Sequence, residues 1–281
     1  MEKTKKHGGI SLNNDLIFVK LGGSIITEKD SPFTVRYDEL KRIVKEIKDA
    51  IDTNPNLKLV IGHGGGSFSH PVANFYKTHN GFIQENSRRG YVLCQSASST
   101  LNKIVVDMMI QYNLNAVSIQ PSACCVSDNG KISYFFMDNI QFFVKNGVIP
   151  VLYGDCVPDK TRGCAIISTE QLLSYLSVHM MKPMRFLVFG FVDGVYTGDP
   201  QINKDVEMIS KINLQNYGYI EPYLTGSYSI DVTGGMLSKV REMLNLAKLG
   251  IQCEIISGLK HGYIKRALSR ETGLGTVIAE K

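Results

Sequence analysis

Short runs of apolar residues alternate along this chain with longer segments in which apolar residues recur at helical spacing. The short runs predict buried strands at residues 16–21, 58–62, 116–119, 148–153, 186–189 and 253–256. The helical spacing predicts helices at residues 37–51, 68–76, 96–112, 140–146, 168–179, 232–249 and 262–268. Because strands alternate with helices, the pattern indicates an α/β fold, a three-layer αβα sandwich with a mainly parallel central sheet.

Length and composition suit a single large globular domain. The chain has 281 residues, of which 43% are hydrophobic and 20% charged, and we expect one domain over residues 15–281. Residues 1–14 are rich in lysine but lack the apolar core of a signal peptide, so we expect a short flexible lead-in. No apolar stretch approaches the roughly 18–20 residues that cross a bilayer, so we expect a cytoplasmic protein that does not bind membranes.

The charge and the cysteines exclude several partners. The net charge of +5 is spread along the chain without a dense Lys/Arg stripe, which argues against nucleic acid and is compatible with small anionic substrates. The six cysteines form no C-x-x-C pair, and no histidine spacing suggests zinc. We therefore expect free thiols and no metal held by the protein alone.

The first candidate site follows the first predicted strand. Lys20 and Leu21 run directly into Gly22, Gly23 and Ser24. Glycines allow backbone N–H groups to approach an anion closely, and the lysine adds a positive charge beside them. Unlike in the Walker pattern, the lysine here precedes the glycines. The motif favours phosphate binding over an ordinary turn with a solvated lysine.

A second glycine run follows the second predicted strand, from His63 through Gly64, Gly65 and Gly66 to His70. Three glycines weaken a helix start, so they favour close approach to a ligand. Beside that run, a charged imidazole of His70 is placed to bind a phosphate, whereas His63 is expected to be a packed core residue.

Later turns add candidates for a nucleotide. Gly154 follows a predicted buried strand, and Asp193 and Gly194 follow the next one, with Tyr196 placed to pack on an adenine ring. Residues 231–236 open a predicted helix, so Gly235 and, one turn later, Lys239 suit nucleotide phosphates. A capped surface helix with a solvated lysine is the alternative for the last segment. All these turns follow predicted strands, where ligands collect in such sheets.

In this order, the motifs resemble those of the amino acid kinase superfamily and, within it, the isopentenyl phosphate kinases. The resemblance runs from about residue 16 to the last residue of the chain. Its most specific part is the loop that ends in His70, because a histidine here separates isopentenyl phosphate and fosfomycin kinases from the amino acid, carbamate and uridylate kinases.

The resemblance implies ATP-dependent phosphorylation of isopentenyl phosphate, with Mg²⁺ bridging the nucleotide phosphates, in a homodimer. It implies an acceptor-binding lobe at about 15–181 and a nucleotide-binding lobe at about 182–281. It places Lys20 and Lys29 at the transferring phosphoryl group and His70 on the acceptor phosphate. Gly65 and Gly154 would lie along the acceptor, and the remaining candidates along ATP: Lys20, Gly22, Gly23, Ser24, Gly66, Asp193, Gly194, Tyr196, Gly235 and Lys239.

Two departures from the family pattern leave alternatives open. Ser69 stands where the family usually has glycine before the phosphate-binding histidine. Thr169 and Glu170 stand where it usually has Gly-Asp, which puts the role of the carboxylate in question. The alternatives are a kinase of another small phosphate or a phosphonate such as fosfomycin, and a nucleotide-binding regulator with weak catalysis.

Overall fold

A computed structural model describes residues 15–198, 200, 202–203, 205–224 and 235–281. Its main element is an eight-stranded sheet of order β12-β14-β13-β9-β1-β2-β6-β3. All neighbouring pairs are parallel except β13 and β14, which confirms the expected sheet. The strands are β1 (Leu16–Leu21), β2 (Lys58–His63), β3 (Ala116–Ser118), β6 (Ile149–Tyr153), β9 (Arg185–Gly190), β12 (Lys211–Ile212), β13 (Gln252–Ser257) and β14 (Thr276–Ile278).

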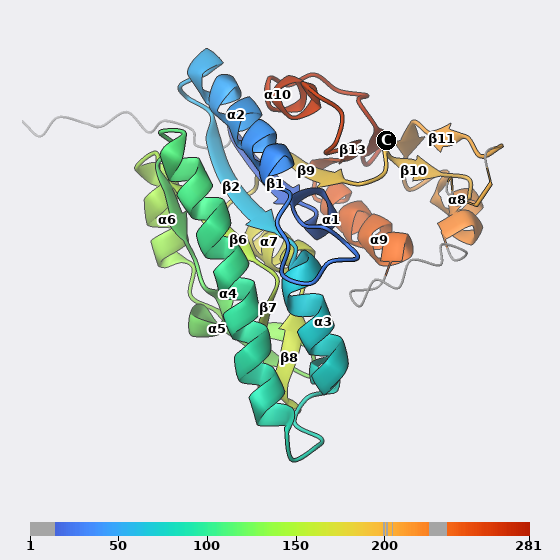
Figure 1. The fold of residues 1–281 in the computed structure, drawn as a ribbon. Helices are drawn as coiled ribbons and strands as arrows, with labels where there is room; N and C mark the ends of the chain where they lie inside the picture. Colours follow the sequence, from blue (N-terminus) through green and yellow to red (C-terminus); the bar gives the residue numbers. More distant parts are fainter. Residues whose placement is uncertain (1–14, 199, 201, 204, 225–234) are drawn as a thin grey trace, which may run out of the picture.

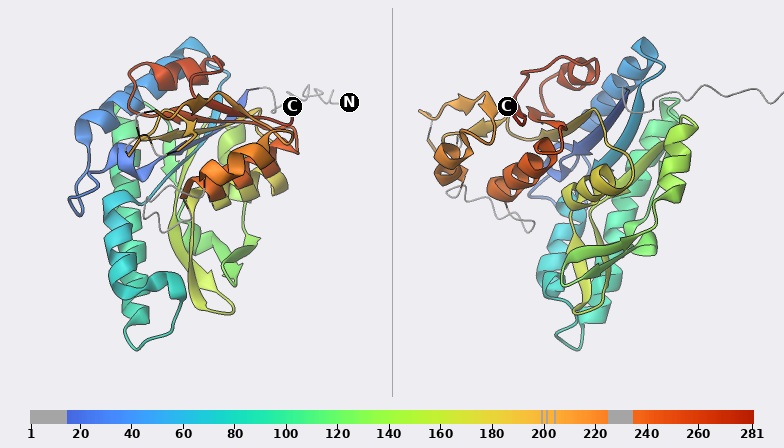
Figure 2. Two further views of the ribbon diagram at one scale, coloured as in Figure 1. Left: turned by 90° about the vertical axis from the view of Figure 1, so that its right-hand side faces the viewer. Right: turned by 180° about the vertical axis from the view of Figure 1, so that it is seen from behind.

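Helices cover both faces of this sheet, so the three-layer αβα prediction is confirmed (Figure 1, Figure 2). Alternate residues of β1 show why. Ile17 and Val19 pack on one face with helices α2 (Tyr37–Thr53), α4 (Ser87–Gln111) and α10 (Tyr263–Leu268). Leu16 and Phe18 pack on the other face with α6 (Asp138–Lys145), α7 (Thr169–His179) and α9 (Gly235–Ala247). Since strand side chains alternate, Lys20 points toward the face of α7 and α9.

A second, four-stranded sheet of order β5-β4-β7-β8 was not predicted. Its strands are β4 (Cys125–Asp128), β5 (Lys131–Phe135), β7 (Asp155–Asp159) and β8 (Gly163–Ile167). Several of their residues are exposed or half-buried, so they lack the continuous apolar runs of the large sheet. This sheet lies beside α3 (Gly66–Tyr76) and α4, which extend beyond the large sheet (Figure 1).

Other boundaries also differ from the prediction. Helix α4 begins at Ser87, although the spacing predicted a start at 96. The elements α1 (Gly23–Ile26), η2 (Thr78–Asn80), α5 (Pro121–Cys124), α8 (Tyr217–Leu224), β10 (Val195–Tyr196) and β11 (Met208–Ile209) were not predicted. The expected lead-in at 1–14 and the first residues of the expected helix at 232–249 lie outside the described residues. Among the described helices, none combines the length and apolar character needed to cross a membrane.

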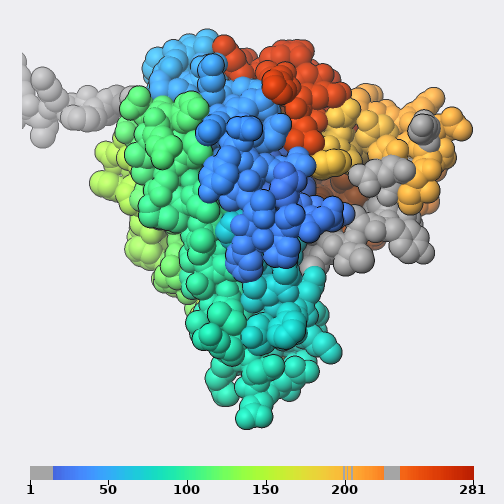
Figure 3. Space-filling model, in the orientation of Figure 1, coloured from blue at the N-terminus to red at the C-terminus, as the bar shows by residue number. Residues whose placement is uncertain are grey.

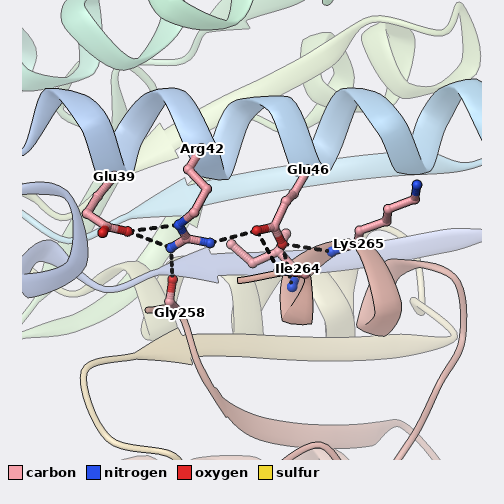
Figure 4. Close-up of polar contacts among 7 residues, drawn as sticks. Glu39, Arg42, Glu46, Gly258, Ile264 and Lys265 are labelled. Carbon is pink, nitrogen blue, oxygen red and sulfur yellow. Dashed lines mark hydrogen bonds and ion pairs between the residues drawn. The ribbon is translucent and has the colours of Figure 1, made fainter. Parts of the chain in front are cut away.

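A polar cluster joins α2 to the segment that follows β13 (Figure 4). Arg42 donates to Glu46 at 2.8 Å and to the carbonyl oxygen of Gly258. The Glu46 carboxylate accepts from the backbone N–H groups of Gly262 at 2.8 Å and Ile264 at 3.0 Å. Because the first N–H groups of a helix have no partner within it, Glu46 satisfies the start of α10 and fixes this segment against α2.

Candidate active site

Two glycine turns meet at the carboxyl edge of the large sheet. The first glycine turn, residues 22–24, follows β1, and the second glycine turn, residues 64–66, follows the adjacent parallel strand β2. A Cβ added to Gly23 would lie 2.5 Å from the backbone nitrogen of Gly66, and one added to Gly64 would lie 2.8 Å from that of Gly23. Direct backbone contact therefore requires glycine in both turns, and the sequence motifs are brought together as predicted.

These turns present backbone N–H groups without protein partners. The amides of Gly23, Ser24, Gly65 and Gly66 donate to none of the residues that the structure describes. They lie at the starts of α1 and α3, where N–H groups and the helix dipole favour an anion. Gly66 adopts φ +51, a backbone conformation that glycine accommodates readily.

Lys20 forms a buried ion pair beside the first glycine turn. Its Nζ lies 2.7 Å from Oε1 of Glu170, and the two side chains are only 10% and 9% exposed. Burial by itself would raise the pKa of Glu170, but the charges of Lys20 and Lys239 and the Lys20 hydrogen bond lower it overall. An ionised carboxylate thus faces two lysines from β1 and α9, although Glu170 was not among the predicted site residues.

The start of α7 is built to hold this carboxylate. Ser168 Oγ accepts from the backbone N–H of Gln171 at 3.1 Å, and Gln171 Oε1 accepts from the N–H of Ser168 at 2.9 Å. This reciprocal capping box fixes the first helical turn, which carries Thr169 and Glu170. The Ser-x-x-Gln spacing was visible in the sequence, but the partner of Glu170 was not.

Thr169, the other departure from the family pattern, is accommodated by Gly62. Its Oγ1 donates to the carbonyl oxygen of His63 at 2.6 Å. The N–H of Gly154 donates to the same oxygen at 3.1 Å. A Cβ on Gly62 would lie 2.4 Å from Thr169 Cγ2, so glycine leaves room for the methyl group. Thr169 therefore supports the chain leading into the second glycine turn.

His63 is a fully buried residue that holds the second glycine turn, in agreement with its expected structural role. Its Nδ1 lies 3.0 Å from the carbonyl oxygen of Gly64, and Asn102 Nδ2 lies 3.1 Å from its Nε2. Burial lowers the pKa of His63 to about 4, with the bond to Gly64 acting in the opposite direction. The neutral ring therefore donates from Nδ1 and accepts from Asn102.

The remaining acceptor candidates lie near the second glycine turn or on an exposed loop. His70 is half-buried one turn into α3, and its Cδ2 lies 3.8 Å from the position of a Cβ on Gly65. Gly154, between β6 and β7, reaches the turn through the His63 carbonyl. Lys29 is exposed on the segment 27–36, which forms part of the surface shown in dark blue in Figure 3. Among the described residues, no hydrogen bond or ion pair joins Lys29 to the other candidates.

The nucleotide candidates fall into two groups. Gly235 begins α9, and Lys239 in the same helix acts electrostatically on Glu170. Asp193 instead pairs with Lys260 at 2.7 Å, and a Cβ on Gly194 would lie 2.6 Å from Thr276 Oγ1 of β14. Tyr196 is half-buried in β10. This second group therefore lies beside β14 and the segment that the Arg42–Glu46 cluster fixes.

A polar cavity of about 360 Å³ lies between the starts of α7 and α9. Its lining residues are Ser168, Glu170, Gln171, Ser238, Lys239, Glu242 and Asn245. Burial raises the pKa of Glu242 to about 7, a bond to Ser174 opposes that shift, and the charge of Glu170 adds to it. Within the described ranges there is no group of three or more His, Cys, Asp or Glu side chains that could hold a metal ion.

Comparison with known proteins assigns this architecture to a family. A sequence model described as the amino acid kinase family matches residues 15–257. The chain therefore belongs to the amino acid kinase family.

Within that family, it is grouped with the isopentenyl phosphate kinases. The Methanothermobacter thermautotrophicus isopentenyl phosphate kinase is 38% identical over 273 residues, 95% of this chain and 100% of the relative. The Methanocaldococcus jannaschii enzyme is 40% identical over 233 residues, 80% and 85% of the two chains. An X-ray structure of an isopentenyl phosphate kinase aligns with TM-score 0.81 and 35% identity over 94% of this chain and 100% of that one.

Proposed function

We propose that this chain transfers the γ-phosphoryl group of ATP to isopentenyl phosphate, giving ADP and isopentenyl diphosphate. The observation that carries the proposal is the contact of two turns with free N–H groups beside the buried Lys20–Glu170 pair. Two phosphates facing each other need donors and positive charge on both sides, and this arrangement offers them. The kinases of that name among its relatives support the same acceptor.

The acceptor chemistry requires charge neutralisation more than a base. A phosphate monoester is ionised near neutral pH, so an acceptor oxygen attacks the γ-phosphorus directly while the bond to the β-phosphate oxygen breaks. In our proposal, Lys20 and Lys29 neutralise the transferring group and His70 binds the acceptor phosphate, with Gly65 and Gly154 beside it. Alignment and preorganised donors then lower the barrier.

The nucleotide is proposed to lie on the other side of the transferring group. Its phosphates would contact the first glycine turn, Gly66, Gly235 and Lys239, and its nucleoside the segment with Asp193, Gly194 and Tyr196. Mg²⁺ would neutralise phosphate charge and would arrive bound to ATP. We further propose the two lobes, about 15–181 and 182–281, a homodimer and a cytoplasmic location.

The test is coupled turnover of the full chain with ATP, Mg²⁺ and a panel of acceptors. Isopentenyl phosphate should be the preferred acceptor; absence of turnover with it, alongside good turnover of another acceptor, would refute the substrate assignment. Lys20→Ala should lower kcat by roughly 10²–10³ because it removes a charge aimed at the transition state. His70→Ala should instead raise the apparent KM for the acceptor, and an unchanged KM would remove His70 from the site.

The same panel decides between the alternatives. Preferred turnover of fosfomycin would identify a phosphonate kinase, which shares the His70 loop. ATP binding without transfer to any acceptor would identify a regulator. The regulator alternative rests on Thr169 and Glu170, and the 2.7 Å contact with Lys20 argues that the longer glutamate side chain still holds the lysine.

A further inference from the structure

Ser69 is a largely buried residue whose hydroxyl has no hydrogen-bond partner among the described residues. The residue is 7% exposed, in the first turn of α3. Buried helical serines commonly donate to the carbonyl four residues earlier, as Ser177 does to Leu173 at 2.8 Å. Ser69 makes no such bond to Gly65, and its hydroxyl bonds to none of the residues placed by the structure. Ser69 Oγ is not among the fully buried polar atoms that lack a partner, so this oxygen is accessible and free to donate to a ligand.

The position of this oxygen indicates which ligand. Ser69 Oγ lies 1.8 Å from the position that a Cβ on Gly65 would occupy, so it rests against the α-carbon of the second glycine turn. His70 Cδ2 is 3.8 Å from the same position. The hydroxyl, the imidazole edge and the free N–H groups of Gly65 and Gly66 therefore gather at the start of α3, and each N–H or O–H is a donor.

We propose that Ser69 Oγ donates a hydrogen bond to the acceptor's phosphate group and is an additional binding residue of this site. The inference rests on the proposed function and specifies how this chain recognises the acceptor. A phosphate monoester offers three terminal oxygens, so it can accept from the turn amides, His70 and Ser69 together. The glycine usual at this position in the family lacks the fourth donor.

The experiment compares Ser69→Ala with Ser177→Ala in the full chain. The control removes a buried serine hydroxyl that is already satisfied within its own helix. A hydrogen bond to a charged group corresponds to roughly a 10-fold to 100-fold change in affinity, so Ser69→Ala should raise the acceptor KM about 10-fold or more. The KM for ATP should stay within about twofold and kcat within about threefold, while Ser177→Ala changes none of them.

A direct binding measurement separates this inference from the proposed function. Calorimetric titration of each variant with isopentenyl phosphate needs no turnover, so it reads the contact even if wild-type protein phosphorylates another acceptor. Weaker binding to Ser69→Ala than to Ser177→Ala supports the contact; equal binding, or equal changes in the KM values for ATP and acceptor, overturns it. If Ser69→Ala unfolds at a lower urea concentration than wild type, the near-isosteric Ser69→Cys, a poor donor, replaces it and should show the same selective loss.

Discussion

Acid should destabilise this protein through His63, and the size of the effect follows from its surroundings. The ring is buried, its Nδ1 bonds to Gly64, and Asn102 donates to its Nε2 at 3.1 Å. Protonation would place two donors face to face at Nε2. The folded pKa is lowered from 6.5 to about 4, chiefly by burial, so between those values the unfolded chain binds the proton and the folded chain does not.

The effect of His63 on the unfolding free energy therefore has a defined direction and size. The stability due to neutral His63 is fully present above pH 6.5 and is lost as the pH falls toward 4. A difference of about 2.5 pKa units at 1.36 kcal/mol each amounts to about 3 kcal/mol of unfolding free energy. Asp155 and Glu242 change the stability in the opposite direction, because burial raises their pKa values to about 6 and about 7. The pH dependence of the wild-type unfolding free energy is therefore the sum of all three effects.

The assay is urea unfolding of wild type and His63→Gln at several pH values from 7.5 to 4.5. Both proteins retain Asp155 and Glu242, so the difference between their unfolding free energies isolates His63. That difference should shrink by about 2–3 kcal/mol as the pH falls. His79→Gln, which removes an exposed histidine, serves as the control. A difference that stays constant across the range would refute the buried neutral ring.

Three further predictions concern glutamate pairs and glycine contacts. Glu170→Gln should lower kcat at least 10-fold because it releases Lys20, whereas Glu170→Asp keeps the charge and should have a kcat between those of wild type and Glu170→Gln. Steady-state kinetics that give wild type and Glu170→Gln equal kcat values would contradict this role. Arg185→Leu should lose about 3–5 kcal/mol of unfolding free energy, because the buried Glu254 carboxylate keeps its hydrogen bond from Gln252 but loses its positive partner. Arg185→Leu combined with Glu254→Leu should recover much of this loss in urea titrations; an additive double variant would argue against the pair. Gly23→Ala should lower the unfolding free energy by at least 1–3 kcal/mol, since its Cβ would lie 2.5 Å from the backbone of the second glycine turn. As a control, Gly218→Ala in α8, where no atom lies near the added Cβ, should raise it by about 0.5–1 kcal/mol. Equal shifts of the melting temperature in the two variants would contradict the contact.

The sequence was informative wherever a short-range pattern decides the structure. Apolar runs predicted the central strands. Because parallel neighbours have their carboxyl ends at the same edge of a sheet, no further pattern was needed to place the two glycine turns together. The contact between the turns after β1 and β2 follows from that rule alone. Family membership rested on the same motifs, and the matched relatives agree with it.

What could not be predicted depends on pairing between distant segments. Glu170 stood out in the sequence only as a departure from the family pattern, because its partner on β1 is set by the order of the strands in the sheet. The early start of α4 was hidden by Gly90, a poor helix former, yet a Cβ there would lie 2.4 Å from the Cβ of Tyr76. The missing side chain lets α3 pack closely on α4. The small sheet was hidden by mixed burial and an irregular register between Val126 and Ser127.

The central place of β1 has a consequence for synthesis of the chain. This strand is made before the other strands of the sheet, and its partner on one edge, β2, follows soon after. The partner on its other edge is β9, which begins only at Arg185. A nascent chain that stops short of that residue carries a β1 edge whose backbone N–H and C=O groups are open to pairing with other molecules. Translation pauses upstream of Arg185 would therefore prolong the interval in which this protein is most prone to aggregate.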